Sequence, residues 1–292
     1  MSTPVNHHYV SECHLKEFFN TQEKRIYLYD KEINNFYHKP GTKKIFSLNN
    51  LNTRLVGDVI DQQSMEYELR VMFEDNFSKH IQSIKRLYDD HSLIGTIYND
   101  LNFLALMALV GEYRNPHYKK GLDNALASFD EHFKSAGGIV EQKLKHDQVL
   151  YSNLKGYIDI ATKMLMKMDP MTFAIVSIKS ADHFIVPDTS GFLIRENFET
   201  GRVIQLGLPI SDKLFILGRS VAMGHYPTTL VEIKDQNSEV VFRINSDLVN
   251  YAYKTVACKN EGFLRKTIKR MRKVGFIGQH FFEATIGSPA KA

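Results

Sequence analysis

The fold class follows from the stretch KRIYLYDKEINNFYH, residues Lys24–His38. In its first part the apolar residues Ile26 and Leu28 alternate with tyrosines, and a polar segment at 30–32 separates it from a second extended run. Two such runs joined by a short polar turn predict a β-hairpin. A lone hairpin is marginally stable in water, so this one needs other strands as partners.

Partner strands are expected after residue 171, where apolar residues recur with a period of two. The expected strands are Thr172–Ser177, His183–Val186, Phe192–Arg195, Arg202–Leu206, Lys213–Leu217 and Leu230–Val231. Residues 44–48 form a further short extended segment. If the hairpin pairs with the late strands, the two ends of the chain form one sheet.

The middle of the chain has helical periodicity. A short helix should begin at Ser11, which can act as its N-cap. The longer helices are expected at Gln62–Tyr88, Leu93–Tyr113, Lys120–Lys134, Val140–Met168, Asn245–Val256 and Gly262–Lys273. The first of these has a 3.6-residue apolar period through Met65, Leu69, Met72, Phe73, Phe77, Ile81, Ile84 and Leu87. Because helices and strands form separate runs, the sequence predicts an α+β fold with a large helical insertion packed on the sheet.

The composition is that of a globular protein, with 43% apolar and 24% charged residues among 292. No apolar run approaches the roughly 20 residues that span a bilayer. The N-terminus lacks the pattern of a secretory signal, and two cysteines, Cys13 and Cys258, are too few for a disulfide framework. We therefore expect a cytoplasmic protein without a membrane partner. The sequence leaves the oligomeric state open.

The positive charge is concentrated near the C-terminus. Residues 259–273 carry a charge of +6, while the whole chain carries +4. The residues that could contact a nucleic-acid backbone are Lys266, Lys269, Arg270, Arg272 and Lys273. The alternative is a docked amphipathic helix with a solvated basic face, since Leu264, Ile268 and Met271 share one side.

The opening segment Asn6–Phe19 is unusually rich in reactive side chains, with three histidines and a cysteine. Zinc accepts such ligands, but closed sites take paired ligands from two separate elements. Cys13 and His14 are adjacent on an expected helix and point in different directions, so we predict no local metal site. The signatures of P-loops, dinucleotide-binding folds, zinc proteases and serine hydrolases are also absent.

Several short motifs, in order along the chain, resemble those of the DUF4238 family, whose function is unknown. They are His7-His8-Tyr9-Val10 with Leu15–Phe18, Tyr27–Asp30, the helix containing Glu68 and Glu74, Arg114-Asn115-Pro116, Phe184–Asp188, Leu208–Ser211 and Asn245–Ala252. The chain departs from the family pattern at Ser11, Cys13, Thr189 and Ser190. The resemblance implies one domain over residues 1–292, with an N-terminal motif and hairpin (1–50), a helical region (60–169), strands (171–232) and late helices (245–273).

Five polar residues from distant parts of these motifs form the candidate catalytic set: His8, Tyr9, Glu74, Arg114 and Asp188. Histidine is a general acid or base near neutral pH. Arginine holds phosphate or carboxylate groups with two hydrogen bonds. Glu74 and Asp188 could bind a divalent metal or orient His8. The structural alternative is a buried ion network that fixes how the helices meet the sheet.

Two functional hypotheses remain open. The first is an enzyme acting on a phosphate-containing substrate, with nucleic acid as the substrate of a nuclease-like effector. The second is a non-catalytic interaction module that binds its partner through the basic C-terminal helix.

Overall fold

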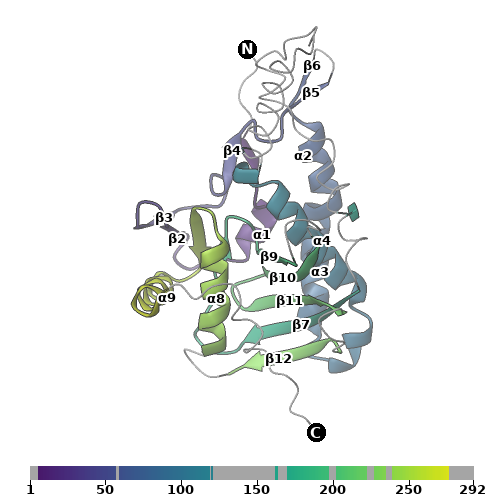
Figure 1. Cartoon of the computed structure of the whole chain (residues 1–292), viewed down its shortest axis with the longest axis vertical. Coiled ribbons are helices and arrows are strands. Elements are labelled where there is room, and N and C mark those ends of the chain that lie inside the picture. Colours follow the sequence, from purple (N-terminus) through teal and green to yellow (C-terminus); the bar gives the residue numbers. More distant parts are fainter. Residues whose placement is uncertain are drawn as a thin grey trace.

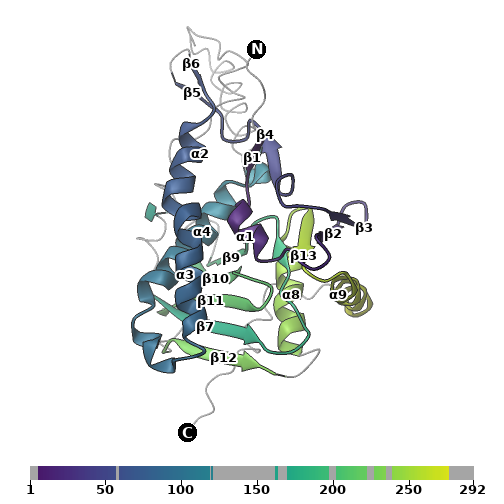
Figure 2. The ribbon, with the colours of Figure 1, turned by 180° about the vertical axis from the view of Figure 1, so that it is seen from behind.

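The computed structural model describes residues 6–56, 59–118, 120, 162–163, 170–196, 202–221, 227–234 and 239–275. The fold is α+β, as predicted. A five-stranded sheet occupies its centre, with α3 and α4 on one side and α8 on the other (Figures 1 and 2). Its order is β12 (Thr229–Ile233), β7 (Met171–Ile178), β11 (Leu214–Ser220), β10 (Val203–Pro209) and β9 (Phe192–Arg195). Only the β12–β7 pairing is parallel within this sheet.

Both faces of the five-stranded sheet are buried, and alternate residues of each strand face different cores. In β7, Phe173 and Ile175 pack toward the α3 and α4 side, while Ala174 and Val176 pack on the opposite side. This alternation follows from the two-residue period of a strand. Helices on both faces explain why the strands are apolar on both sides.

The hairpin pairs with late strands, as predicted. It consists of β2 (Ile26–Asp30) and β3 (Asn35–Lys39), and it belongs to a separate four-stranded sheet of order β3-β2-β13-β8. Here β13 is Thr255–Cys258 and β8 is Val186–Pro187. The expectation of one sheet is therefore wrong, because the late strands divide between two sheets.

Strand β13 begins inside a segment that was predicted to be helical, so this prediction is wrong at its C-terminal end. The periodicity predicted a helix over Asn245–Val256, but α8 spans Glu239–Tyr251 and the chain then turns into β13. The predicted helix Gly262–Lys273 is α9 (Glu261–Val274), which begins at an Asn260 cap. Leu264, Thr267, Ile268 and Met271 of α9 are buried, and the helix packs against α8 and β2.

The predicted helix Gln62–Tyr88 is a single run that contains a π-helical turn. It comprises α2 (Ser64–Leu69), the π turn Arg70–Glu74 and α3 (Asp75–Arg86). Its buried residues Met65, Leu69, Phe73 and Phe77 are spaced by four, more than the 3.6 residues of an α-turn. A wider π turn absorbs this difference and keeps them on one face. Met72 was predicted on that face but is 47% exposed.

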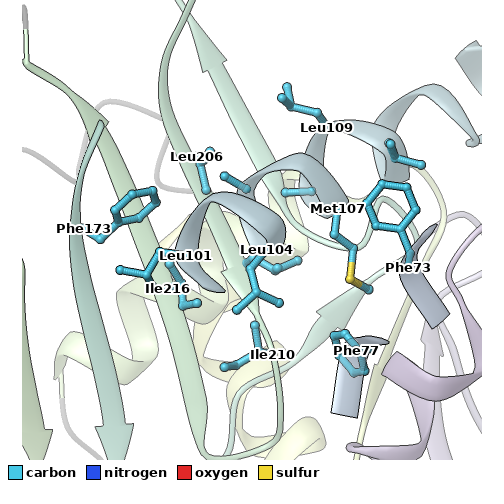
Figure 3. Packing of buried hydrophobic residues seen from close by; sticks show 14 of the residues in the cluster. Phe73, Phe77, Leu101, Leu104, Met107, Leu109, Phe173, Leu206, Ile210 and Ile216 are labelled. Atoms are coloured by element: carbon cyan, nitrogen blue, oxygen red, sulfur yellow. The ribbon is translucent and has the colours of Figure 1, made fainter. Parts of the chain in front are cut away.

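Helix α4 (Tyr98–Tyr113) covers one face of the central sheet and follows a 3₁₀ turn at His91–Gly95. Figure 3 shows Leu101, Leu104 and Met107 of α4 between Phe73 and Phe77 on one side and Ile216 on the other. Pro116 follows its end, consistent with the predicted stop. Among the residues that the structure describes, no helix is both long and apolar enough to cross a lipid bilayer.

The N-terminus forms β1 (Asn6–His8), which pairs with β4 (Ser47–Asn49). The expected short helix is α1 (Glu12–Lys16), with Ser11 at its N-cap position. A further small hairpin joins β5 (Arg54–Val56) and β6 (Val59–Asp61). The predicted helices Lys120–Lys134 and Val140–Met168 lie outside the described residues, apart from positions 120 and 162–163.

Candidate functional site

Three of the five predicted catalytic residues meet where β1, the π turn and the end of α4 come together. Arg114, at the C-cap of α4, donates a hydrogen bond to the backbone carbonyl of His8 in β1. Glu74 is the last residue of the π turn and interacts electrostatically with Arg114. The structure thus brings His8, Glu74 and Arg114 into one polar cluster from segments far apart in sequence.

The imidazole of His8 is held in its neutral form. Burial and the nearby Arg114 guanidinium lower its pKa, while the Glu12 and Glu66 carboxylates oppose this effect in part. Its Nε2 atom is buried and makes no hydrogen bond of acceptable geometry. A neutral imidazole with an uncommitted nitrogen is able to accept a proton.

The guanidinium of Arg114 is 4% exposed and incompletely paired. One terminal nitrogen binds the His8 carbonyl and lies 3.7 Å from a Glu66 carboxylate oxygen. Its Nε is buried and has no hydrogen-bond partner. Because buried polar groups are nearly always paired, such a donor points to a ligand or water at this position.

The carboxyl group of Glu74 is half-buried, and burial raises its pKa. The Arg114 guanidinium acts in the opposite direction, and the neighbouring carboxylates of Glu66 and Glu12 raise the pKa further. We find no hydrogen bond or ion pair to this carboxyl group within the described residues. A carboxyl group with a raised pKa is suited to donate a proton.

Tyr9 lies beside this cluster. Its backbone N–H donates to the Phe46 carbonyl over 2.8 Å, and its ring packs against Phe46. Burial raises the pKa of the phenol, which therefore stays protonated and able to donate. With Arg114 and Ser190 it lines a cavity of about 10 Å³, which is roughly the space that one water needs.

The carboxylate of Asp188 binds backbone groups that lie outside this cluster. Its carboxylate accepts hydrogen bonds from the backbone N–H groups of Tyr253, Lys254 and Thr255, at 2.8–2.9 Å. Burial raises its pKa, and these three donors act against that effect. Its own carbonyl accepts from the side chain of Asn115, the residue after Arg114, and its carboxylate adds to the raised pKa of the Tyr9 phenol. This geometry is that of a structural anchor.

Two residues near this cluster, Glu66 and His7, were not in the predicted catalytic set. Glu66 faces Arg114, whereas Glu68, which carried the resemblance, is exposed. His7 is fully buried, and its Nδ1 accepts a hydrogen bond from the Asn52 N–H over 2.9 Å. Helical phase could have indicated Glu66, since positions i and i+8, such as Glu66 and Glu74, lie near one helix face, whereas Glu68 is six residues from Glu74.

A second buried polar group is centred on Glu112 of α4, two residues before Arg114. The Glu112 carboxylate binds both terminal nitrogens of Arg195 and accepts the Tyr251 hydroxyl over 3.0 Å. Sequence patterns gave no indication of it, because its members come from α4, β9 and α8. It joins the α4 side of the central sheet to the α8 side.

The basic residues of α9 are largely engaged inside the chain. Arg270 pairs with Glu239 and lies over the Phe242 ring, and Arg272 donates to the Tyr29 hydroxyl over 2.8 Å. Lys269 and Lys273 are exposed, and in the described part of the chain they have no ion-pair partner. This arrangement favours a docked helix over a phosphate-binding face.

The histidines of the opening segment do not converge with Cys13 on one point. His14 is fully buried, and its Nε2 lies 2.6 Å from the Pro209 carbonyl. Burial raises the pKa of the Cys13 thiol to about 11, which keeps it protonated. Within the described ranges, no three histidine, cysteine or acidic side chains are positioned to hold a metal ion.

Comparison with known proteins identifies the family. A family model described as "Protein of unknown function (DUF4238)" matches residues 6–262. Because this match covers most of the chain, the protein belongs to the DUF4238 family, as the motifs predicted. No curated protein and no solved structure matches it.

Proposed function

We propose that the protein is an enzyme that acts on a phosphate-containing substrate at the cluster of His8, Glu74 and Arg114. The observation that carries the proposal is that two buried nitrogens, His8 Nε2 and Arg114 Nε, lack hydrogen-bond partners while the Arg114 guanidinium binds the His8 backbone carbonyl. The His8 nitrogen is suited to take a proton, and the Arg114 nitrogen is suited to bind an oxyanion.

The charge balance of the cluster is compatible with an anionic substrate. Arg114 offsets Glu66, and Lys16 lies 3.4 Å from Glu12. Burial raises the pKa of Glu74, which disfavours a negative charge on this carboxyl group. In this reaction His8 would activate the nucleophile, Arg114 would bind a phosphate oxygen and Glu74 would protonate the leaving group.

We expect nucleic acid to be the phosphate-containing substrate. The test uses the full chain with labelled single-stranded and double-stranded DNA and RNA, and with bis(4-nitrophenyl) phosphate, with and without Mg²⁺ or Mn²⁺. The His8→Asn and Glu74→Gln variants change the chemistry with little change in shape. General acid–base groups contribute about 10²–10⁴-fold, so each variant should lose that much activity.

His38, an exposed histidine of β3, provides the matched control through His38→Asn. Thermal unfolding should give the same midpoint for the control, the two site variants and the wild type. A wild-type chain that cleaves no phosphodiester would contradict the proposal, and so would full activity in His8→Asn.

A further inference from the structure

A groove of about 450 Å³ opens where α1 and α3 end and β7 leaves the central sheet. Its walls also include the β10–β11 turn and the residue after β13. The volume is that of a small-molecule site, for which 300–1,000 Å³ is typical. Its residues do not include His8, Glu74 or Arg114, so the groove is separate from the proposed site.

The groove has an excess of positive charge. Five lysines line it against three acidic residues. The lysines come from five parts of the chain and are Lys16, Lys85, Lys179, Lys213 and Lys259. This excess of positive charge over the acidic residues of the same groove favours an anionic ligand.

Most of these lysines have partners that an anion could replace. Lys85 lies 3.5 Å from Glu17, and Lys259 lies 3.3 Å from Asp212, with side chains 41% and 35% exposed. The Lys85–Glu17 pair is partly exposed on both sides and contributes about 0–1 kcal/mol, so it yields readily to a doubly charged ligand. The partner of Lys259 is less accessible, because the Asp212 side chain is 10% exposed and also pairs with His183. Lys213 is different, because its ammonium binds the carbonyls of Ser180 and Asp182 and so serves the fold.

The wall beside Lys179 presents a hydroxyl and an aromatic ring. Ser177 is 3% exposed, and its hydroxyl interacts with the phenol of Tyr88. Tyr88 lies next to it, and the Lys179 ammonium lies 5.1 Å from the centre of the Tyr88 ring. Phe19 adds a second ring to the lining. An anion and a flat apolar group would each find matching surface here.

We propose that this groove binds a small organic phosphate, with its phosphate among Lys85, Lys179 and Lys259 and its ring system against Tyr88 and Phe19. Lysine ammonium groups bind phosphate as point charges, and the Ser177 hydroxyl supplies a further donor. The required ligand is of mononucleotide size, and the proposal does not depend on catalysis at His8.

Isothermal titration calorimetry on the full chain tests this with three probes: inorganic phosphate, pyrophosphate and adenosine monophosphate. Adenosine monophosphate should bind most tightly, because only it offers a ring. Lys179→Gln and Lys85→Gln should each weaken binding about tenfold, the loss of about 1.4 kcal/mol expected for one charged contact. Lys39→Gln on β3, an exposed lysine outside the groove, is the matched control and should leave the affinity unchanged.

The same titration with His8→Asn distinguishes the groove from the proposed catalytic site, since groove binding should persist there. Without ligand, the lysine variants should unfold at the same midpoint temperature as the wild type. The proposal is overturned if none of the probes binds. It is also overturned if adenosine monophosphate binds no more tightly than inorganic phosphate, or if Lys39→Gln weakens binding as much as Lys179→Gln.

Discussion

Asp247 of α8 should make the protein less stable as the pH rises. It is 7% exposed, its Oδ2 is buried without a hydrogen-bond partner, and burial raises its pKa to about 7. The ordinary value is 3.8. Between these two pH values the unfolded chain releases a proton that the folded chain retains, so the free energy of unfolding falls with increasing pH. Since one pKa unit corresponds to about 1.4 kcal/mol, the total loss is about 4 kcal/mol.

The Asp247→Asn variant keeps the shape and removes the charge. Urea unfolding followed by circular dichroism at pH 4, 6 and 8 should show the variant up to about 4 kcal/mol more stable than the wild type at pH 8. At pH 4 this advantage should vanish, because both side chains are then neutral. The matched control is Asp75→Asn, on an exposed part of α3, which should stay within about 0.5 kcal/mol throughout. A stability difference that is the same at all three pH values would refute the reasoning.

Two further predictions concern the packing around α1 and α4. Complete burial lowers the pKa of His14 to about 4, so stability should fall by about 3 kcal/mol as the pH drops from 6.5 to 4. His14→Leu in an Asp247→Asn background should abolish that slope in urea unfolding, and an unchanged slope would contradict it. A Cβ at Gly111 would lie 2.6 Å from Ser190 Oγ and 3.1 Å from the Thr189 carbonyl oxygen, so Gly111→Ala should lower stability by about 1–3 kcal/mol. Adding Ser190→Gly should restore part of the lost stability, because Ser190 has a φ of 67° that favours glycine. If thermal unfolding shows no recovery in the double variant, the clash with Ser190 is not the cause.

Local periodicity predicted most strands and helices but not their long-range pairing. Phe192–Arg195 was predicted with the bounds that β9 has, since period-two alternation is a local property. The division into two sheets depends on which strands meet β2, and that contact joins residues more than two hundred positions apart. The exposure of Met72 depends on the π turn, which a 3.6-residue period does not anticipate.

The motifs were sufficient to predict three residues of the candidate site. His8, Glu74 and Arg114 meet because β1, the π turn and the end of α4 converge, and the resemblance had assigned all three to conspicuous motifs. Glu66 was missed because its neighbour Glu68 has the same charge and only the helical phase distinguishes them. Side-chain chemistry alone could not distinguish these two neighbouring glutamates.

The role of Asp188 and the early end of α8 have one physical cause. A helix continuing to Val256 would need the N–H groups of residues 253–255 as donors and the carbonyls around Val249 as acceptors. The Asp188 carboxylate accepts all three of those N–H groups. On the acceptor side, the Lys31 ammonium binds the carbonyls of Val249, Asn250 and Ala252.

Both charged groups therefore take up the hydrogen-bonding capacity that further helical turns would use, and the chain leaves α8 to form β13. Lys31 lies in the hairpin turn after β2, and Asp188 directly follows β8. The segment is thus held between the strands that pair with it on either side. Helical periodicity over Asn245–Val256 was correct as a local preference, and contacts from two distant residues override it. The same contacts commit the Asp188 carboxylate to the four-stranded sheet, which is why it does not join His8 and Arg114.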